Sequence, residues 1–282
     1  MEAGKVIDPM GKPAPVQRSS SMPKVRAVER AVKILRAFTP EQPRLGLSEI
    51  ARAVALDKAT VLRLLMTLES CGLVLTDPMS KTYSLSYNVV ALGAGVPEQA
   101  DIQQIAEPVL REISARTECM AFLSTFGDNG ALCVARSFVD LPVRVRLWSI
   151  GETRPYHQGA APRLLFAHLP ETRQQDILTR PLPRATAQTV TDPAQLLRDA
   201  TALRGQRWCM FADDIVVGLA GIGHGVYRPD GELMAAVSVS GLTPMVAGER
   251  TEAIRGILAD AAEELQRLFK LANLDTSTLI GT

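Results

Sequence analysis

The sequence predicts an α+β protein of two parts, and three observations support this fold class. Residues 24–87 contain three short helical patterns followed by a predicted β-hairpin. Residues 101–282 combine predicted antiparallel hairpins with separate helices. The first part carries ten Lys or Arg residues against six Asp or Glu, whereas residues 87–282 carry 18 against 22. This division of charge indicates that the first part faces an anionic partner such as nucleic acid.

The composition is typical of a globular cytoplasmic protein. Of the 282 residues, 46% are hydrophobic and 22% are charged, and no apolar run approaches the ~20 residues of a membrane helix. Residues 1–23 contain four Pro and three consecutive Ser, and they lack the apolar stretch of a secretion signal. We therefore expect a disordered tail over 1–23, a cytoplasmic location and no membrane partner.

Three helices open the first part. Apolar residues at helical spacing predict a helix over 27–38, which the stretch TPEQPRLG ends. A second helix is expected from Ser48, as its N-cap, to Val54. The third lies in LDKATVLRLLMTLESCGLV, residues 56–74, with Asp57 as N-cap and Gly72 as the stop signal.

A hairpin follows the third helix. Residues 73–75 and 82–85 are expected to form its strands, and 77–81 its turn. Three short helices followed by a hairpin predict a winged helix-turn-helix over 24–87. A linker helix over 88–100 is expected to connect it to the second part.

The front end of the third helix has the residues of a recognition helix. Such a helix buries one face in its own core and presents its N-terminal residues to base edges and phosphates. Lys58, Thr60 and Arg63 lie at that end, and Arg63 suits a guanine edge or a phosphate. Two alternatives remain open, because Thr60 can simply support the cap and Arg63 can be a solvated side chain.

Three further residues are candidates for DNA contact. Ser48, at the start of the preceding helix, is suited to bind a phosphate together with the free N–H groups of that helix. In the hairpin, Lys81 and Tyr83 are expected to meet the flanking backbone. Tyr83 can alternatively be a core aromatic of the hairpin.

The second part alternates hairpins and helices. A long helix begins near Ile102 and continues beyond Ile113, and an amphipathic helix over 247–271 closes the chain. Turn signals at 128–130 and 228–231 predict two hairpins. The expected strands are 119–127, 131–139, 143–151, 219–227 and 233–242, and the expected intervening helices are 160–169, 171–179 and 193–204.

These patterns resemble the IclR family of bacterial transcriptional regulators over roughly residues 25–270. The family's motifs are R-A-x-x-I-L in the first helix, L-x-E-I-A in the second, [KS]-x-T-x-x-R-L-L in the third, and a wing ending in Y-x-L. The chain reads RAVKIL, LSEIA, KATVLRLL and YSL at these places. The family's Y-x-L-G is Tyr83-Ser84-Leu85-Ser86 here.

The resemblance implies a C-terminal GAF-like effector-binding domain with an antiparallel sheet and three pocket segments. The family's P-L-H-A-T-A-x-G-K-A-L-L-A corresponds to PYHQGAAPRLLFA, residues 155–167. An acidic residue and a glycine match as Asp214 and Gly218, but the C-I-A-A-P-V-like strand reads GIGHGV, residues 221–226. The family's S-V-S-G is present at 238–241.

The residue types in these segments are those of a small-molecule site. N–H groups at a helix start near Gly159 and Ala160 can hold a carboxylate, and Asp214 can accept a bond from a ligand or fix its loop. Ser238 and Ser240, two apart on a strand, present both hydroxyls on one face. The candidate effector-binding residues are Met120, Phe122, Trp148, Gly159, Ala160, Asp214, Gly221, Ile222, His224, Ser238 and Ser240.

Several of these features have a plainer interpretation. The glycines at 221, 223 and 225 are expected to leave room for a larger ligand beside the strand. His224 is either a ligand-specific hydrogen bonder or a residue outside direct contact. Arg144 and Arg146 share a strand face that attracts an anionic effector, is solvated or contacts another subunit. The three histidines have no metal-ligand spacing, so neither a metal nor a cofactor is expected.

The expected function is a ligand-responsive transcriptional regulator. It would bind a palindromic operator in double-stranded DNA as a homodimer or dimer of dimers and control a catabolic operon. Its effector would be a small organic acid, with an aromatic acid favoured by the space beside the glycines. A thiol-based redox regulator is one alternative, although Cys119, Cys133 and Cys209 lie in apolar contexts that favour inert core thiols. The other is an enzyme with an appended DNA-binding domain, although the C-terminal part contains no GxSxG, HExxH or phosphate-loop motif.

Overall fold

The computed structural model describes residues 25–39, 42–93, 102–137 and 148–274. The chain divides into two compact units, Met1–Pro97 and Glu98–Thr282, and each is described by itself. The expected disordered tail over 1–23 lies outside the described residues. None of the helices in the described part of the chain is both long and apolar enough to span a bilayer.

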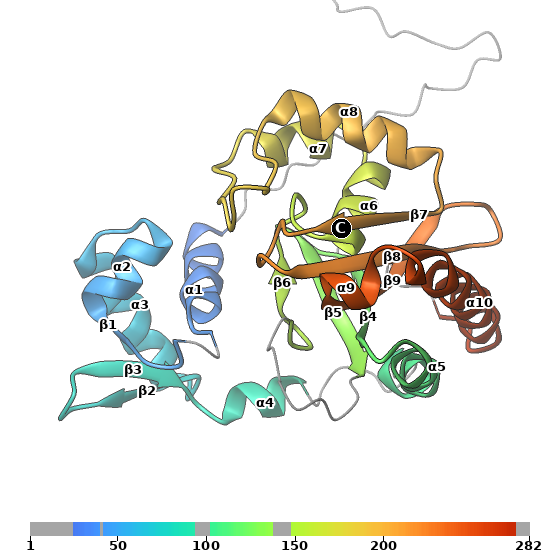
Figure 1. Ribbon diagram of the computed structural model, residues 1–282. Helices are drawn as coiled ribbons and strands as arrows, with labels where there is room; N and C mark the ends of the chain where they lie inside the picture. Colours follow the sequence, from blue (N-terminus) through green and yellow to red (C-terminus); the bar gives the residue numbers. More distant parts are fainter. Residues whose placement is uncertain (1–24, 40–41, 94–101, 138–147, 275–282) are drawn as a thin grey trace, which may run out of the picture. The chain divides into compact units, whose positions relative to one another are not determined.

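The N-terminal unit is a winged helix-turn-helix, as predicted (Figure 1). Three helices pack around one small core, and three short antiparallel strands lie in the order β1-β3-β2. The elements are α1 (Arg26–Ala37), β1 (Leu45–Gly46), α2 (Leu47–Val54), α3 (Lys58–Ser70), β2 (Val74–Asp77), β3 (Thr82–Leu85) and α4 (Asn88–Gly93). The strand β1, which pairs with β3, was not predicted.

Local capping signals set the ends of α3. The Asp57 side chain accepts a hydrogen bond of 2.8 Å from the Thr60 backbone N–H, as expected of an N-cap. Gly72, just past the helix, has a φ of +72°, which L side chains rarely adopt. One face of the helix is anchored in the core of the unit by the buried side chains Val61, Leu65 and Leu68.

The predicted cap of α2 is wrong. The N-cap is Gly46, two residues earlier, and Ser48 is the exposed second residue of the helix. The Glu49 carboxylate turns back instead and accepts a hydrogen bond of 2.7 Å from the Gly46 N–H. A glutamate at the third helical position therefore accepts from the backbone N–H of the N-cap residue, Gly46, and Ser48 plays no part in the cap.

The start of the predicted linker helix is present as α4. Its first residue, Asn88, donates a side-chain hydrogen bond of 3.2 Å to the carbonyl oxygen of Gly72. This bond ties α4 to the chain segment that follows α3. Residues 94–100, the rest of the predicted linker, lie outside the described residues.

The C-terminal unit is an α+β sandwich around a six-stranded antiparallel sheet of order β6-β5-β4-β9-β8-β7. The strands are β4 (Met120–Phe126), β5 (Ala131–Ser137), β6 (Thr153–Arg154), β7 (Trp208–Ala212), β8 (Leu219–Tyr227) and β9 (Leu233–Leu242). The hairpins β4–β5 and β8–β9 confirm the two turn predictions. The central pairing of β4 with β9 joins residues that are far apart in the chain.

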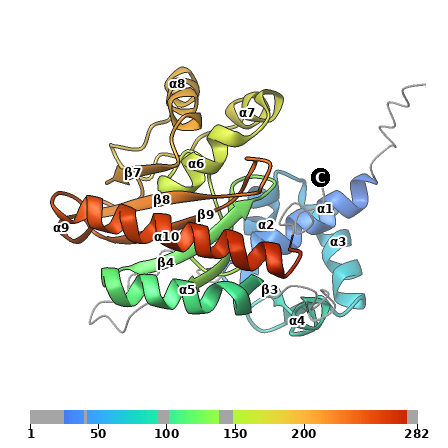
Figure 2. The same ribbon diagram turned by 90° about the vertical axis from the view of Figure 1, so that its right-hand side faces the viewer.

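Helices cover both faces of this sheet, and each face has its own core. The helices α5 (Ile102–Thr117) and α10 (Arg250–Leu271) lie side by side on one face (Figure 2). On the other face, α6 (Ala160–His168) packs on the sheet and α8 (Pro193–Arg204) packs on α6. The short helix α7 (Glu171–Leu178) is held to α6 by hydrogen bonds from Gln174 to the Phe166 and Ala167 carbonyl oxygens.

Three predictions about this unit need correction. The strands β6 and β7 were not predicted. Of the strand expected over 143–151, residues 143–147 lie outside the described residues and 148–151 are not strand. The final helix begins at Arg250 rather than 247, because Thr243–Val246 form the separate helix α9 and Gly248 has a φ of +79°.

Candidate functional sites

The front end of α3 presents two cations. Lys58 is the first residue of the helix and Arg63 lies on its second turn, and both side chains are exposed. Thr60 is half-buried, and its side chain helps to lower the pKa of Asp57. Thr60 therefore takes part in the cap, whereas Lys58 and Arg63 remain available to a partner.

The other three DNA-binding candidates differ in exposure. Ser48 and Lys81 are exposed, and Lys81 stands in the turn of the wing with a φ of +53°. Tyr83 is half-buried on β3 and packs against the core of the N-terminal unit. The structure thus gives Tyr83 a packing role, which was the alternative left open.

Two apolar residues on α3 escaped the sequence-based selection. Leu62 is 39% and Met66 61% exposed. With Lys58 they follow the i, i+4, i+8 spacing that places side chains on one helix face. Exposed apolar side chains on the same helix face as an exposed cation indicate a surface that contacts a partner, because a helix used only for packing would bury them.

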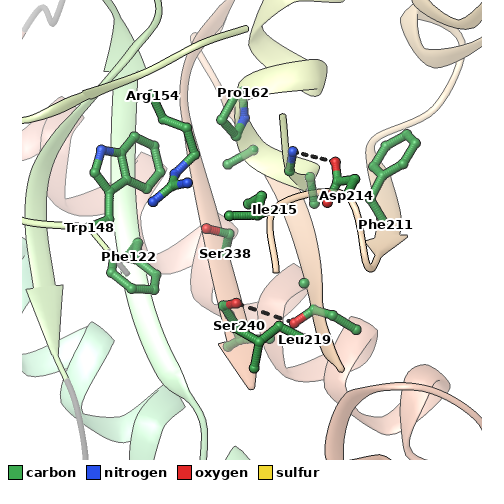
Figure 3. A pocket seen from close by; sticks show the side chains of 16 residues that line it. Phe122, Trp148, Arg154, Pro162, Phe211, Asp214, Ile215, Leu219, Ser238 and Ser240 are labelled. Atoms are coloured by element: carbon green, nitrogen blue, oxygen red, sulfur yellow. Dashed lines mark hydrogen bonds between the residues drawn. The ribbon is translucent and has the colours of Figure 1, made fainter. Parts of the chain in front are cut away.

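The C-terminal unit contains a pocket on the α6 side of its sheet (Figure 3). Its walls come from the strands β4 and β6–β9, from Trp148, from the start of α6 and from the loop after β7. The empty space between these walls is about 510 Å³, and part of it is open to solvent.

Most of the predicted effector-binding residues line this one pocket. They come from six separate places in the chain, which the fold brings together. The lining includes Phe122, Trp148, Gly159, Ala160, Asp214, Gly221, Ser238 and Ser240.

Three predicted residues are not among those that line the pocket. Ile222 and His224 alternate on β8 with Gly221 and Gly223, so their side chains point to the opposite face of the sheet. Ile222 is fully buried in the core beneath α5 and α10. Met120 is half-buried and packs against the core on the α6 face.

His224 is a buried residue on that opposite face. Its Nδ1 lies 3.0 Å from the Gly225 carbonyl oxygen. Burial lowers the pKa of His224, and the nearby charges of Arg207 and Arg255 add to this effect. A neutral histidine away from the pocket fits the second of the two interpretations considered for it.

The glycines of β8 serve packing more than ligand space. A Cβ on Gly223 would lie 3.0 Å from the Ala161 backbone nitrogen, and one on Gly225 would lie 2.5 Å from the Tyr227 ring. Only Gly221 among the three lines the pocket. The expectation that all three leave room for a ligand is therefore wrong, because Gly223 lets α6 approach the strand.

Asp214 fixes the entrance of α6. Its Oδ2 accepts a hydrogen bond of 2.6 Å from the Gly159 N–H, and Gly159 has a φ of +83°. Burial raises the pKa of Asp214, while the Gly159 bond and the charges of Arg163 and Arg154 lower it. At the N-terminal end of α6, where a ligand carboxylate was expected, the carboxylate of Asp214 therefore already accepts the Gly159 N–H.

Sequence reasoning missed the pocket's cation and one of its aromatic walls. Arg154 on β6 and Phe211 on β7 both line the pocket. The Arg154 guanidinium carbon lies 5.4 Å from the centre of the Trp148 ring. Phe211 is stacked by Arg163, whose guanidinium carbon lies 3.9 Å from the ring centre and which pairs with Asp199 on α8. Neither strand was predicted, so these side chains could not be placed.

The cysteines are poor redox candidates except for one. Burial raises the pKa of Cys133 and of Cys209 to about 12, and it also raises that of Cys119. Buried thiols that stay protonated react slowly. Cys71, at the C-cap of α3, is exposed.

The two units together define a class of protein. A winged helix-turn-helix with exposed cations on its third helix is a DNA-binding module. An α+β unit with an internal pocket, joined to it in one chain, is the arrangement of a ligand-responsive regulator of transcription.

Comparison with known proteins specifies the family. Residues 27–78 match the model of the IclR helix-turn-helix domain, and residues 94–267 match that of the bacterial transcriptional regulator IclR C-terminal domain. The chain therefore belongs to the IclR family of bacterial transcriptional regulators. It is a DNA-binding regulator with a C-terminal effector domain and not an enzyme.

Individual relatives agree with this assignment. The Pca regulon regulatory protein of Pseudomonas putida is 29% identical over 216 residues, which span 76% of this chain and 73% of that protein. A putative IclR regulator from Silicibacter has a TM-score of 0.74 at 24% identity, covering 86% of this chain and 96% of its own. An IclR homologue from Microbacterium hydrocarbonoxydans, solved with 4-hydroxybenzoate, has a TM-score of 0.67 at 22% identity, covering 87% and 99%.

Proposed function

We propose that this protein controls a catabolic operon in response to a small organic acid, and that an aromatic acid is the effector. The observation that carries this proposal is the lining of the pocket. Three aromatic rings, Phe122, Trp148 and Phe211, line the same space as the cation Arg154 and the hydroxyl of Ser238. Apolar walls with a few placed polar groups are typical of small-molecule sites, and here the polar groups suit an acid.

One solved relative supports an aromatic acid without specifying it for this chain. That homologue, from Microbacterium hydrocarbonoxydans, holds 4-hydroxybenzoate. For this chain the effector's identity rests on the pocket's own chemistry.

The DNA contacts are proposed from the exposed residues of the N-terminal unit. Arg63 takes a base edge or a phosphate, and Lys58, Ser48 and Lys81 take phosphates. Thr60 and Tyr83 act indirectly, through the cap of α3 and the packing of the wing. A homodimer or dimer of dimers would place paired α3 helices on a palindromic operator.

Two linked measurements test this function. A thermal-shift screen of carboxylic acids and aromatic catabolites should identify acids that raise the unfolding temperature, because a ligand of the native state stabilises it. Footprinting should then show protection upstream of the operon that flanks the gene, altered by the same acids. Absence of protection both with and without metabolites would refute the proposal.

A further inference from the structure

The pocket contains two side chains of opposite charge, on different walls. Arg154 comes from β6 at one edge of the sheet, and Asp214 comes from the loop that follows β7, the strand at the other edge. In Figure 3 the Arg154 guanidinium points into the space beside Trp148 and above Phe122, while Asp214 lies near Phe211 on the opposite side. A ligand that spans the pocket therefore meets a positive and a negative end.

The Asp214 end is closed to a ligand carboxylate. One Asp214 oxygen already holds the Gly159 N–H at 2.6 Å. The loop that carries Asp214 is fixed from outside, because Thr189 Oγ1 donates to the Asp214 carbonyl oxygen at 2.7 Å and Thr186 Oγ1 to that of Asp213 at 2.5 Å. A second carboxylate beside Asp214 would suffer like-charge repulsion in a partly desolvated site.

The Arg154 end is built to hold an anion. Burial lowers the pKa of Arg154, while the carboxylates of Glu152 and Asp214 raise it. Its stacking partner Trp148 is fixed on two sides, since the indole Nε1 donates to the Glu152 carbonyl oxygen at 2.9 Å and Arg136 donates to the Trp148 carbonyl oxygen at 2.8 Å. A guanidinium stacked on a fixed ring presents its donors in one orientation, which suits bidentate recognition of a carboxylate.

Ser238 adds a neutral donor on the sheet floor of the pocket. It lies on β9 opposite Phe122 of β4. Within the described residues its hydroxyl makes no hydrogen bond, whereas Ser240 donates to the Ala220 carbonyl oxygen at 3.3 Å. Ser238 is therefore free to donate to a ligand without breaking a protein contact.

We infer that Arg154 receives the carboxylate of the effector, so that the acid end lies beside Trp148 and an uncharged end faces Asp214. This inference rests on the proposed function and adds an orientation and a ligand class to it. The class is a monocarboxylate with an apolar or aromatic body, whose far end is neutral and preferably carries a hydroxyl that can donate to Asp214. A second carboxylate at the far end is excluded by Asp214.

The test compares acids with their neutral amides by isothermal titration calorimetry. The probes are benzoate and 4-hydroxybenzoate, their primary amides benzamide and 4-hydroxybenzamide, and the dicarboxylate terephthalate. The proteins are the full-length wild type, Arg154→Gln, Arg154→Lys and the control Arg198→Gln. Arg198 is an exposed arginine on α8 that is not among the pocket-lining residues.

We expect 4-hydroxybenzoate to bind the wild type more tightly than benzoate or terephthalate. Arg154→Gln should weaken binding of the acids by about 10- to 100-fold, the cost of losing hydrogen bonds between charged groups. Binding of the amides should change by less than about threefold, because the interaction lost is with the carboxylate. Arg154→Lys keeps the charge, so its affinity for the acids should lie between those of the wild type and Arg154→Gln. Arg198→Gln should bind the acids as tightly as the wild type does.

Each other outcome contradicts a defined part of the account. If the acids bind the wild type and Arg154→Gln equally well, the orientation is wrong and the acid-responsive function stands. If acid and amide lose the same affinity, Arg154 has only a packing role. If neither benzoate nor 4-hydroxybenzoate binds the wild type, both the inference and the proposed aromatic-acid effector are refuted. Thermal unfolding of each variant shows whether it is folded before titration.

Discussion

Arg63 is the residue on which sequence-specific DNA binding is proposed to depend most. Its side chain is exposed on α3, while Val61 and Leu65 of the same helix are fully buried. Removing a solvent-exposed side chain from a well-anchored helix should affect the partner rather than the fold. The same argument does not apply to Thr60, which takes part in the cap.

Arg63→Ala should weaken specific operator binding by about 1–3 kcal/mol if Arg63 makes a bidentate base contact. Fluorescence anisotropy with labelled operator DNA measures the effect, and circular dichroism checks the fold. Arg111→Ala is a matched control, because Arg111 is an exposed arginine of the C-terminal unit paired with Glu107. If the folded Arg63→Ala protein binds the operator as tightly as the wild type, Arg63 does not make the proposed base contact.

The redox alternative depends at the residue scale on one thiol. Burial raises the pKa values of Cys133 and Cys209 to about 12, so at pH 8 their thiolate fractions are negligible. In the native protein, a thiol reagent such as DTNB at pH 8 should therefore label Cys71 alone in the fast phase. Cys71→Ser should abolish that phase and leave the response to effector unchanged. A second fast-reacting thiol, or a Cys71→Ser protein that no longer responds, would favour redox regulation.

At the scale of elements, the contact of α6 with β8 shapes the pocket. Gly223 is the point of closest approach, since a Cβ there would lie 3.0 Å from the Ala161 nitrogen and 3.2 Å from the Ala160 carbonyl carbon. Backbone atoms cannot move aside as a side-chain tip can. Any side chain at 223 must therefore push the start of α6, and with it Gly159 and Asp214, away from the sheet.

Gly223→Ala should destabilise the protein by about 1–3 kcal/mol through this overpacking and should weaken ligand binding. Gly256→Ala is the control, because Gly256 lies within α10 and a Cβ there would meet nothing within 4 Å. It should instead stabilise by about 0.5–1 kcal/mol, as expected for glycine in a helix. Urea unfolding of both variants measures the difference. Equal stability of the two would mean that α6 does not press on β8 at this point.

Which elements could be predicted depended on how local their signals are. Asp57 and Gly72 mark the ends of α3 through contacts within a few residues, and Asp128-Asn129-Gly130 marks a hairpin in the same way. The two-residue strand β6 and the five-residue strand β7 carry no comparable signal, because they are stabilised by pairing with distant strands. Arg154 and Phe211 were missed with them.

The residues of the pocket were predicted correctly where a family motif covered them. The prediction was wrong where it had to choose which face of a strand lines the pocket. Ser238, Ser240 and Asp214 were identified from the motif and line the pocket. Ile222, and His224 in the ligand-binding one of its two interpretations, were placed on the wrong face, because the sequence GIGHGV does not say which face of β8 meets α6. A glycine in a strand can make room for a ligand or for a packed helix. The close contact of Gly223 with the start of α6 shows that the helix is the reason at this position.

At the scale of the whole molecule, the account requires that the pocket and the DNA-binding surface influence each other. Coupling between two sites is reciprocal, so an effector that changes DNA affinity must have its own affinity changed by DNA in the same ratio. Within the N-terminal unit, Asn88 of α4 is bonded to Gly72, directly after α3. A displacement of α4 would therefore reach the end of the recognition helix through this bond.

The most direct test of the central claim is the affinity of the protein for its operator with and without saturating effector, measured by fluorescence anisotropy of labelled DNA. The account predicts a change in the dissociation constant of about 5- to 150-fold, the usual range of such coupling. It also predicts that the effector's affinity, titrated against the protein–DNA complex, changes by the same factor. An acid that binds the pocket and leaves the operator affinity unchanged would contradict the claim.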